Sequence, residues 1–258
     1  MNKALLLSGI FSIAIIPIDC IADHLRPKSG EILKGGQLFH TNMKNLDLRN
    51  RDLSNANLSS ANLTNSDLRN TKFVDSNLNK TNFSNSDLRG AILNNLDLRR
   101  TILRGANLSR ANLSGANLNG PDLNGSRLKG ANLSKANLSR IDLRGSNLRG
   151  ADLSGANLSS SDLSYSKISG ANLSRANLTD ANLRGASITE ADLRKAMLKR
   201  TDLRNAKLVG TDLTNANLSD ANLRASNLSG VKANKLVGCP ILLPIRWVCE
   251  KKSLINTN

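Results

Sequence analysis

The sequence predicts an all-β solenoid, a tube wound from many short extended pieces of one chain. From Leu33 to Leu228 an apolar residue recurs at every fifth position, and it is Leu at all but five of these 40 positions. Two residues earlier, 33 of the 40 positions hold Ala, Ser or Thr, and one residue earlier 30 hold Asn or Asp. A constant short period is typical of stacked repeat architectures, so the repeat dominates the fold prediction.

The order of residues within each five-residue unit explains how such a tube forms. Side chains alternate between two faces of an extended chain, so the small residue and the Leu share one face. Because five is odd, a straight strand would turn the next Leu to the wrong side. Each unit therefore needs a bend at its last position, where Gly, Asn and Ser recur, as at Gly90, Gly105 and Gly145. The bends keep Leu inside the tube.

Two other interpretations of the pattern fail. An amphipathic helix needs apolar residues at spacings of three and four, which a strict five does not give. A disordered low-complexity chain would not keep a hydrophobe in phase across some 200 residues. Aromatic residues make up only 2% of the chain, too few for an ordinary layered core.

The unit A/S/T-N/D-L-x-x resembles the repeat of the pentapeptide-repeat family, over about three quarters of the chain. The resemblance implies a right-handed quadrilateral β-helix over residues 33–232, with four units in each coil. It also implies about ten coils and a rod roughly 48 Å long at the usual spacing of strands. Some cytosolic members protect DNA gyrase by imitating the charge of duplex DNA, but a chain of net charge +16 departs from that requirement.

The N-terminal segment predicts export from the cytoplasm. Met1-Asn2-Lys3 is a short basic start, an apolar run from Ala4 to Ile16 follows, and Pro17 ends it. This pattern is typical of a secretory signal peptide over residues 1–22, cleaved after Ala22. A buried helix of a cytosolic protein is the alternative. Residues 23–32 are predicted to be an N-terminal lead-in, and no transmembrane segment is expected after cleavage.

The C-terminal residues 233–258 are predicted to cap the open end of the last coil. Once the signal peptide is removed, Cys239 and Cys249 are the remaining cysteines, and an even count in an exported chain suggests a disulfide. Two separate buried thiols are the alternative. Leu-Pro-x-x-Trp at Leu243–Trp247 resembles hairpins beside the arrays of other exported pentapeptide-repeat proteins. The apolar residues of the cap form a candidate surface for a partner or for a homodimer: Leu236, Leu242, Leu243 and Trp247.

The basic residues are candidates for binding an anion. Folded in twenties, the chain places one group of cations along one wall of the N-terminal half and another along the neighbouring wall of the C-terminal half. The alternative is a ladder of compensated charges, because seven Asp-Leu-Arg units bring Asp and Arg to the same outer face. The candidate stripe consists of Arg49, Arg69, Arg89, Lys129, Arg149, Arg104, Arg144, Arg184, Arg204 and Arg224.

The sequence contains no recognisable catalytic constellation, phosphate-binding loop or Cys/His metal cluster, so we expect neither an enzyme nor a cofactor. Nucleic acid is an unlikely partner, because few aromatic residues are present to stack on bases. We expect local bulging where Leu96, Pro121 and Ile141 replace the small residue. The predicted function is an exported scaffold that binds an anionic lipid, glycan or protein. The alternative is a secreted effector or inhibitor that binds one specific protein through its cap.

Overall fold

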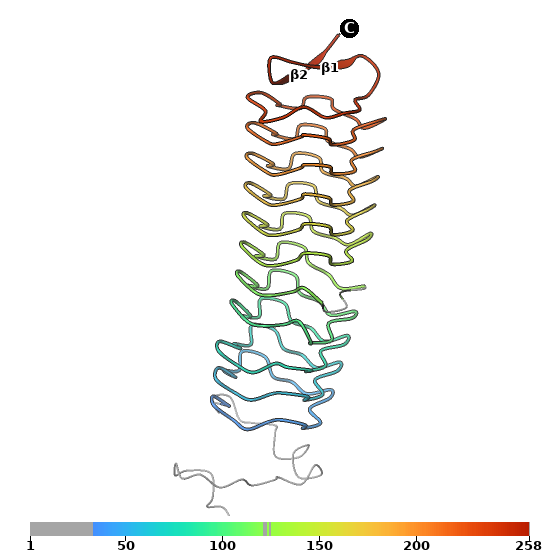
Figure 1. The fold of residues 1–258 in the computed structure, drawn as a ribbon. Coiled ribbons are helices and arrows are strands. Elements are labelled where there is room, and N and C mark those ends of the chain that lie inside the picture. Colours follow the sequence, from blue (N-terminus) through green and yellow to red (C-terminus); the bar gives the residue numbers. More distant parts are fainter. Residues whose placement is uncertain (1–32, 121–122, 124, 258) are drawn as a thin grey trace, which may run out of the picture.

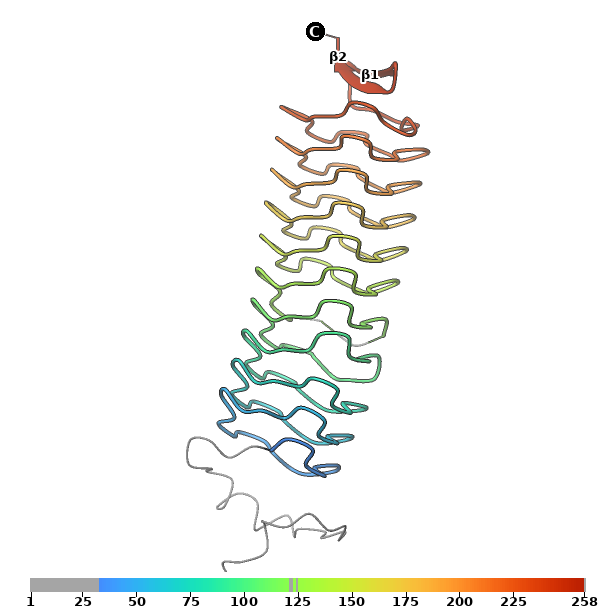
Figure 2. The same cartoon turned by 90° about the vertical axis from the view of Figure 1, so that its left-hand side faces the viewer.

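A computed structural model describes residues 33–120, 123 and 125–257; the predicted signal peptide, the lead-in and Pro121 lie outside this part. The described chain winds into a stack of similar coils along one axis (Figure 1) (Figure 2). Parallel bridges join residues 20 apart, from Gln37 with Asn57 to Asp212 with Lys232. Four five-residue units therefore make one coil, and each wall is a ladder of parallel bridges between successive coils.

The interior of the tube is filled by the central residue of each unit. From Met43 to Leu228 these residues are at most 3% exposed, and the rings of Phe73 and Phe83 meet edge to face at 5.7 Å. The small residues pack beside them. Where the small residue is Thr, its hydroxyl can donate to the coil below, as from Thr71 Oγ1 to Leu48 O at 2.8 Å. The predicted placement of Leu and the small residues inside the tube is confirmed.

The bend at the end of each unit is a left-handed backbone conformation. Every fifth residue from Gly35 to Lys235 has a positive φ, with the single exception of Arg100. Gly adopts this conformation freely and Asn more readily than most residues, which explains why both recur there. The position also carries longer side chains, such as Lys135 and Arg175.

The ladder continues for about half a coil beyond residue 232, where the sequence predicted the β-helix to end. Asn217 pairs with Gly238 and Asn222 with Leu242, so one extra residue enters the register before Gly238. Gly238 lies directly against the side chain of Ser219, where any Cβ would overlap the hydroxyl. The close approach explains why glycine is needed at this junction.

Two short strands complete the C-terminal end. Strand β1 (Trp247–Glu250) pairs antiparallel with β2 (Ser253–Asn256), and the hairpin lies beyond the last coil (Figure 1). The amide of Leu254 donates to Ala233 O at 3.0 Å, and the Leu254 side chain is buried. The hairpin therefore covers part of the coil end that would otherwise expose its core.

Candidate functional site

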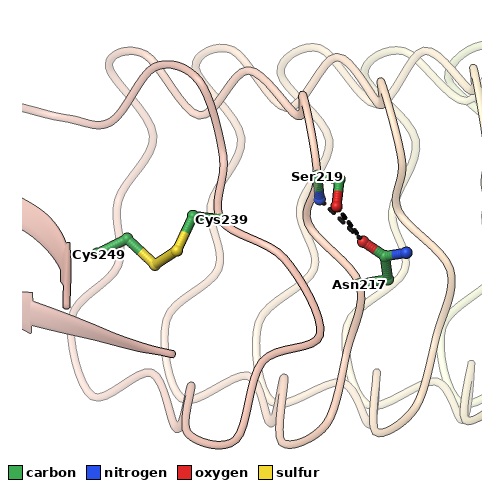
Figure 3. The surroundings of a disulfide bond; sticks show 4 residues. All are labelled: Asn217, Ser219, Cys239 and Cys249. Carbon is green, nitrogen blue, oxygen red and sulfur yellow. Dashed lines mark hydrogen bonds between the residues drawn. A yellow bond between two sulfur atoms is a disulfide. The ribbon is translucent and has the colours of Figure 1, made fainter. Parts of the chain in front are cut away.

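The two cysteines of the cap form a disulfide. The S–S distance between Cys239 and Cys249 is 2.05 Å, and the bond joins the end of the ladder to β1 (Figure 3). Cys239 follows Gly238, whose partner Asn217 accepts hydrogen bonds from the amide and hydroxyl of Ser219. The disulfide thus ties the hairpin to a coil whose register is already fixed.

The four residues predicted to form a cap surface differ in their burial. Leu236 is 1% exposed and belongs to the core, while Leu243 and Trp247 are half-buried against it. Only Leu242, which is 45% exposed, faces outward as proposed. Leu236 is therefore unavailable to a partner, because it fills the position that the small residue holds in the regular coils.

The exposed apolar residues of the cap are others, which the sequence analysis did not single out. Val237 is 65% exposed, Ile241 is 64% exposed and Ile245 is 92% exposed. With Leu242 they form the apolar cap surface. The sequence held a signal for Val237, because it occupies the position that Asn or Asp holds in the regular units and that position points outward.

All seven Asp-Leu-Arg units form ion pairs within the unit, at 2.5–2.7 Å between guanidinium and carboxylate. The alternative of compensated charges therefore holds for half of the predicted stripe. The paired members are Arg49, Arg69, Arg89, Arg144 and Arg204.

In the N-terminal coils these pairs join into a continuous ladder. Arg49 Nε lies 3.6 Å from Asp67 Oδ2, and Arg69 Nε lies 3.8 Å from Asp87 Oδ2. The hydrogen bond from Arg49 lowers the pKa of Asp47 to about 2. Three arginines alternate with three aspartates here, so the part of the stripe from Arg49 to Arg89 carries little net charge.

The other five members of the stripe form no ion pair with any residue in the described part of the chain. They are Arg104, Lys129, Arg149, Arg184 and Arg224. In Arg184 and Arg224 the residue two positions earlier is Asn, whose side chain accepts only the backbone amide of the arginine. The unneutralised charge of the stripe is therefore spread unevenly along the rod.

The C-terminal coils collect further cations on one wall and at the turns that lead into it. Ser187 bridges to Lys167 in the coil below and to Lys207 in the coil above, so the two lysines share this wall. Arg184 in turn contributes to lowering the pKa of Asp202, after the larger effect of the hydrogen bond from Arg204. We call these residues the C-terminal basic face: Lys167, Arg184, Arg204, Lys207 and Arg224. Folding the sequence in twenties would have revealed both lysines.

Cavities lie beside two of the three positions where bulges are expected. A cavity of about 560 Å³ lies beside the Leu96 unit, lined by Asn77, Asn79 and Asp97 among others. A second cavity, of about 470 Å³, lies next to the Ile141 unit and is lined by Leu123 and Leu143. Ladder bonds are absent between residues 74–80 and 94–100, so the coils separate beside Leu96, as predicted.

The described residues were searched for metal-binding clusters and for membrane-spanning helices. No group of three or more His, Cys, Asp or Glu side chains in residues 33–120, 123 and 125–257 is placed to hold a metal ion. Within the same part of the chain there is no helix that is long and apolar enough to cross a membrane. What the outer surface presents is charge, amide side chains and the apolar cap surface.

Comparisons with known proteins find the same repeat elsewhere. A family model of pentapeptide repeats matches eight overlapping segments between residues 41 and 232. HetL, a pentapeptide-repeat protein involved in heterocyst differentiation regulation in the cyanobacterium Nostoc sp. strain PCC 7120, is 32% identical, with 76% of this chain and 87% of HetL covered and a TM-score of 0.32. Rfr23 from the cyanobacterium Cyanothece 51142 is 26% identical over 45% of this chain and 84% of its own, with a TM-score of 0.34.

QnrB1, a plasmid-mediated fluoroquinolone resistance protein, is 17% identical over 77% of this chain and 90% of its own, with a TM-score of 0.37. A search of curated proteins finds no match. The family match spans most of the described coils, with the same five-residue unit that forms their walls. The chain belongs to the pentapeptide-repeat family, and its fold is the right-handed quadrilateral β-helix predicted from the sequence.

Proposed function

We propose that this protein is exported, is not an enzyme, and acts as a rigid scaffold that binds an anionic partner at the cell envelope or outside the cell. The observation that carries the proposal is the C-terminal basic face: Lys167 and Lys207 lie on one wall, and Arg184, Arg204 and Arg224 lie at the turns that lead into it, with Asp162 and Asp202 as the nearby acids. A disulfide in the cap is consistent with an oxidising compartment. Anionic lipid headgroups and acidic glycans have the chemistry that such a face would attract.

The rigidity of the wall supports this function. The backbone of this face is held by ladder bonds between coils, as with Lys207 N to Ala186 O and Tyr165 N to Arg184 O, both at 2.9 Å. A fixed array of charges loses less conformational entropy on binding than a flexible basic tail. We therefore expect binding that depends on the spacing of the charges as well as on their number.

Charge reversal tests the proposal. The triple variant Arg184→Glu, Lys207→Glu and Arg224→Glu should lose salt-sensitive binding to heparin and to vesicles containing phosphatidylglycerol. The matched control is Lys135→Glu, Arg175→Glu and Lys235→Glu, which changes the net charge equally but on the opposite corner of the rod. Equal loss in both variants would show that total charge decides binding, and no binding by the wild type would overturn the proposal.

A second function is favoured by the apolar cap surface. Val237, Ile241 and Ile245 expose large aliphatic side chains close together in the chain, which is typical of a surface that contacts another protein. A second copy of the chain would bury this surface as an end-to-end dimer. Sedimentation equilibrium should then show a dimer that Ile241→Ser with Ile245→Ser converts to a monomer, while a wild-type monomer would exclude that partner.

A further inference from the structure

The wall of the tube is open beside Leu96. This side chain points inward at a position filled by Ser76 in the coil below and by Ala116 in the coil above, and it is 6% exposed. The added volume of a Leu cannot be absorbed by the tight stacking of such coils. The coils carrying residues 74–80 and 94–100 are therefore held apart.

The separation removes four rungs of the hydrogen-bond ladder. Within residues 74–80 and 94–100, the amides of Asp75, Leu78, Lys80 and Asp97 find no acceptor, although the equivalent amides in regular coils donate to the neighbouring coil. The carbonyls that would accept from them likewise have no donor there. They belong to Asn94, Asp97, Arg99 and Ser76.

The opening is a slot with fixed boundaries. It closes on one side where Phe73 N donates to Ile92 O at 3.0 Å, and on the other where Phe83 N donates to Ile102 O at 2.8 Å. We call residues 74–80 the lower lip of the slot and residues 94–100 its upper lip. The lower lip is held to the coil beneath, because Leu58 N donates to Asn77 O at 2.9 Å. The upper lip is bonded to the coil above through Leu98 N and Asn117 O, also at 2.9 Å. Both lips are therefore held in place without a ligand.

The groups that face the slot define the class of ligand. The cavity of about 560 Å³ is lined by residues 76–79 together with Asp97, Arg99 and Arg100. Residues 74–80 present three unpaired amides and the carbonyl of Ser76, and residues 94–100 present three unpaired carbonyls and the amide of Asp97, at the spacing of a β ladder. An extended peptide main chain offers donors and acceptors at the same spacing, and its addition to a free edge is a recurrent mode of recognition.

The charges around the slot give the peptide a direction. Arg99 is neutralised by Asp97 at 2.6 Å, whereas Lys80 and Arg100 are exposed and form no ion pair with any described residue. Both lie at the end towards which the two lips run, and Asp75 lies at the other end. A peptide parallel to the lips would place its carboxyl terminus beside Lys80 and Arg100.

We propose that this slot binds the extended carboxyl-terminal tail of a partner protein, whose main chain fills the missing rungs and whose carboxylate contacts Lys80 and Arg100. The backbone at Arg100 accords with this role, since it alone among the corner residues from Gly35 to Lys235 lacks a positive φ. The slot lies outside the C-terminal basic face, so the proposal does not depend on the function proposed above.

The probe for the test is the acetylated pentapeptide Ala-Asn-Leu-Ser-Asp with a free carboxyl terminus. This is the sequence of residues 216–220, which form the same wall in a later coil. Amide chemical shifts in a ¹⁵N-labelled protein should change at Leu78, Lys80 and Asp97 on titration. The amidated peptide Ala-Asn-Leu-Ser-Asn should bind at least about tenfold more weakly.

Two variants decide whether the slot is responsible. Leu96→Ala restores the small residue and should abolish binding, while hydrogen exchange at Leu78 and Asp97 becomes slower as the rungs close. Lys80→Ser with Arg100→Ser leaves the interior unchanged and should remove the preference for the free carboxylate. No shift with the wild type at millimolar peptide, or equal shifts in wild type and Leu96→Ala, would overturn the proposal.

Discussion

Arg49 reaches from its own coil to the next, with its Nε 3.6 Å from Oδ2 of Asp67. The same guanidinium donates to Asp47 and holds the pKa of that carboxyl at about 2. Since this pKa lies below the ordinary value of 3.8, the stabilisation is fully present above pH 4 and is lost as the pH falls towards 2.

Replacement of Arg49 by Gln should therefore return the pKa of Asp47 to near its ordinary value. Carboxyl ¹³C titration by NMR measures this directly, and the loss of melting temperature between pH 4 and pH 2 should be smaller in the variant. Arg99→Gln is the control, because Arg99 pairs with Asp97 on a different wall. An unchanged titration of Asp47 in Arg49→Gln would contradict the ladder.

Glycines at the bends, the fifth position of each unit, should differ in how much stability is lost when they are replaced by alanine. Gly170 has a φ of +65° and nothing within 4 Å of an added Cβ, so Gly170→Ala should cost about 1 kcal/mol from backbone strain alone. Gly120 has a φ of +138°, and a Cβ there would lie 2.8 Å from Arg99 O. Chemical denaturation should show a larger loss for Gly120→Ala, and equal losses would contradict this contact.

A run of asparagines on one wall forms its own ladder of side-chain amides. Asn157 Nδ2 donates to Asn137 Oδ1 at 3.3 Å, and Asn177 Nδ2 donates to Asn157 Oδ1 at 3.4 Å. Asn157→Asp removes one donor and places two acceptors together, so it should cost roughly 1 kcal/mol at neutral pH. Asn227→Asp is the matched control, because Asn227 follows Lys207 on its wall, and it should cost nothing.

Leu96 should be the unusual leucine of the interior. A buried Leu→Ala substitution ordinarily costs about 2–5 kcal/mol, and Leu98→Ala should do so because Leu98 is a central residue. In Leu96→Ala the coils can approach and regain four ladder bonds, each worth about 0.5–1.5 kcal/mol. Urea denaturation should therefore show a much smaller loss, or none, for Leu96→Ala than for Leu98→Ala.

Loss of the disulfide should loosen the cap before the coils. The bond closes a short loop between Cys239 and Cys249, which is worth about 2–3 kcal/mol by loop entropy. In Cys239→Ala with Cys249→Ala, hydrogen exchange should rise at Leu236 and Leu254, while amides near Leu158 remain protected. Uniform acceleration along the whole rod would show instead that the cap and the coils unfold together.

The repeat itself made most of the fold predictable. One Leu in each five residues, in unbroken phase, leaves a tube as the arrangement that buries all of them, and the bend at the fifth position follows from parity. The bulge at Leu96 was predictable from the same pattern, because a Leu at the inner position of a small residue adds volume between two coils.

The outer surface was less predictable. Whether Arg184 is free and Arg204 is paired depends on the residue two positions earlier, which is Asn in one unit and Asp in the other. The cap was harder, because its register shifts by one residue at Gly238 and the five-residue rule no longer tells inside from outside. Leu236 and Val237 still follow the rule, but Ile241, at the position of a small residue, is exposed.

The opening beside Leu96 also has a mechanical consequence. The ladder bonds run along the axis of the rod, so a force that pulls on its two ends loads every wall in tension. Where four rungs are absent, the same load falls on fewer bonds, and the stress concentrates on Phe73–Ile92 and Phe83–Ile102. Under tension along its length, the rod therefore has a weak point beside Leu96, about a quarter of the way from its first described coil to its cap.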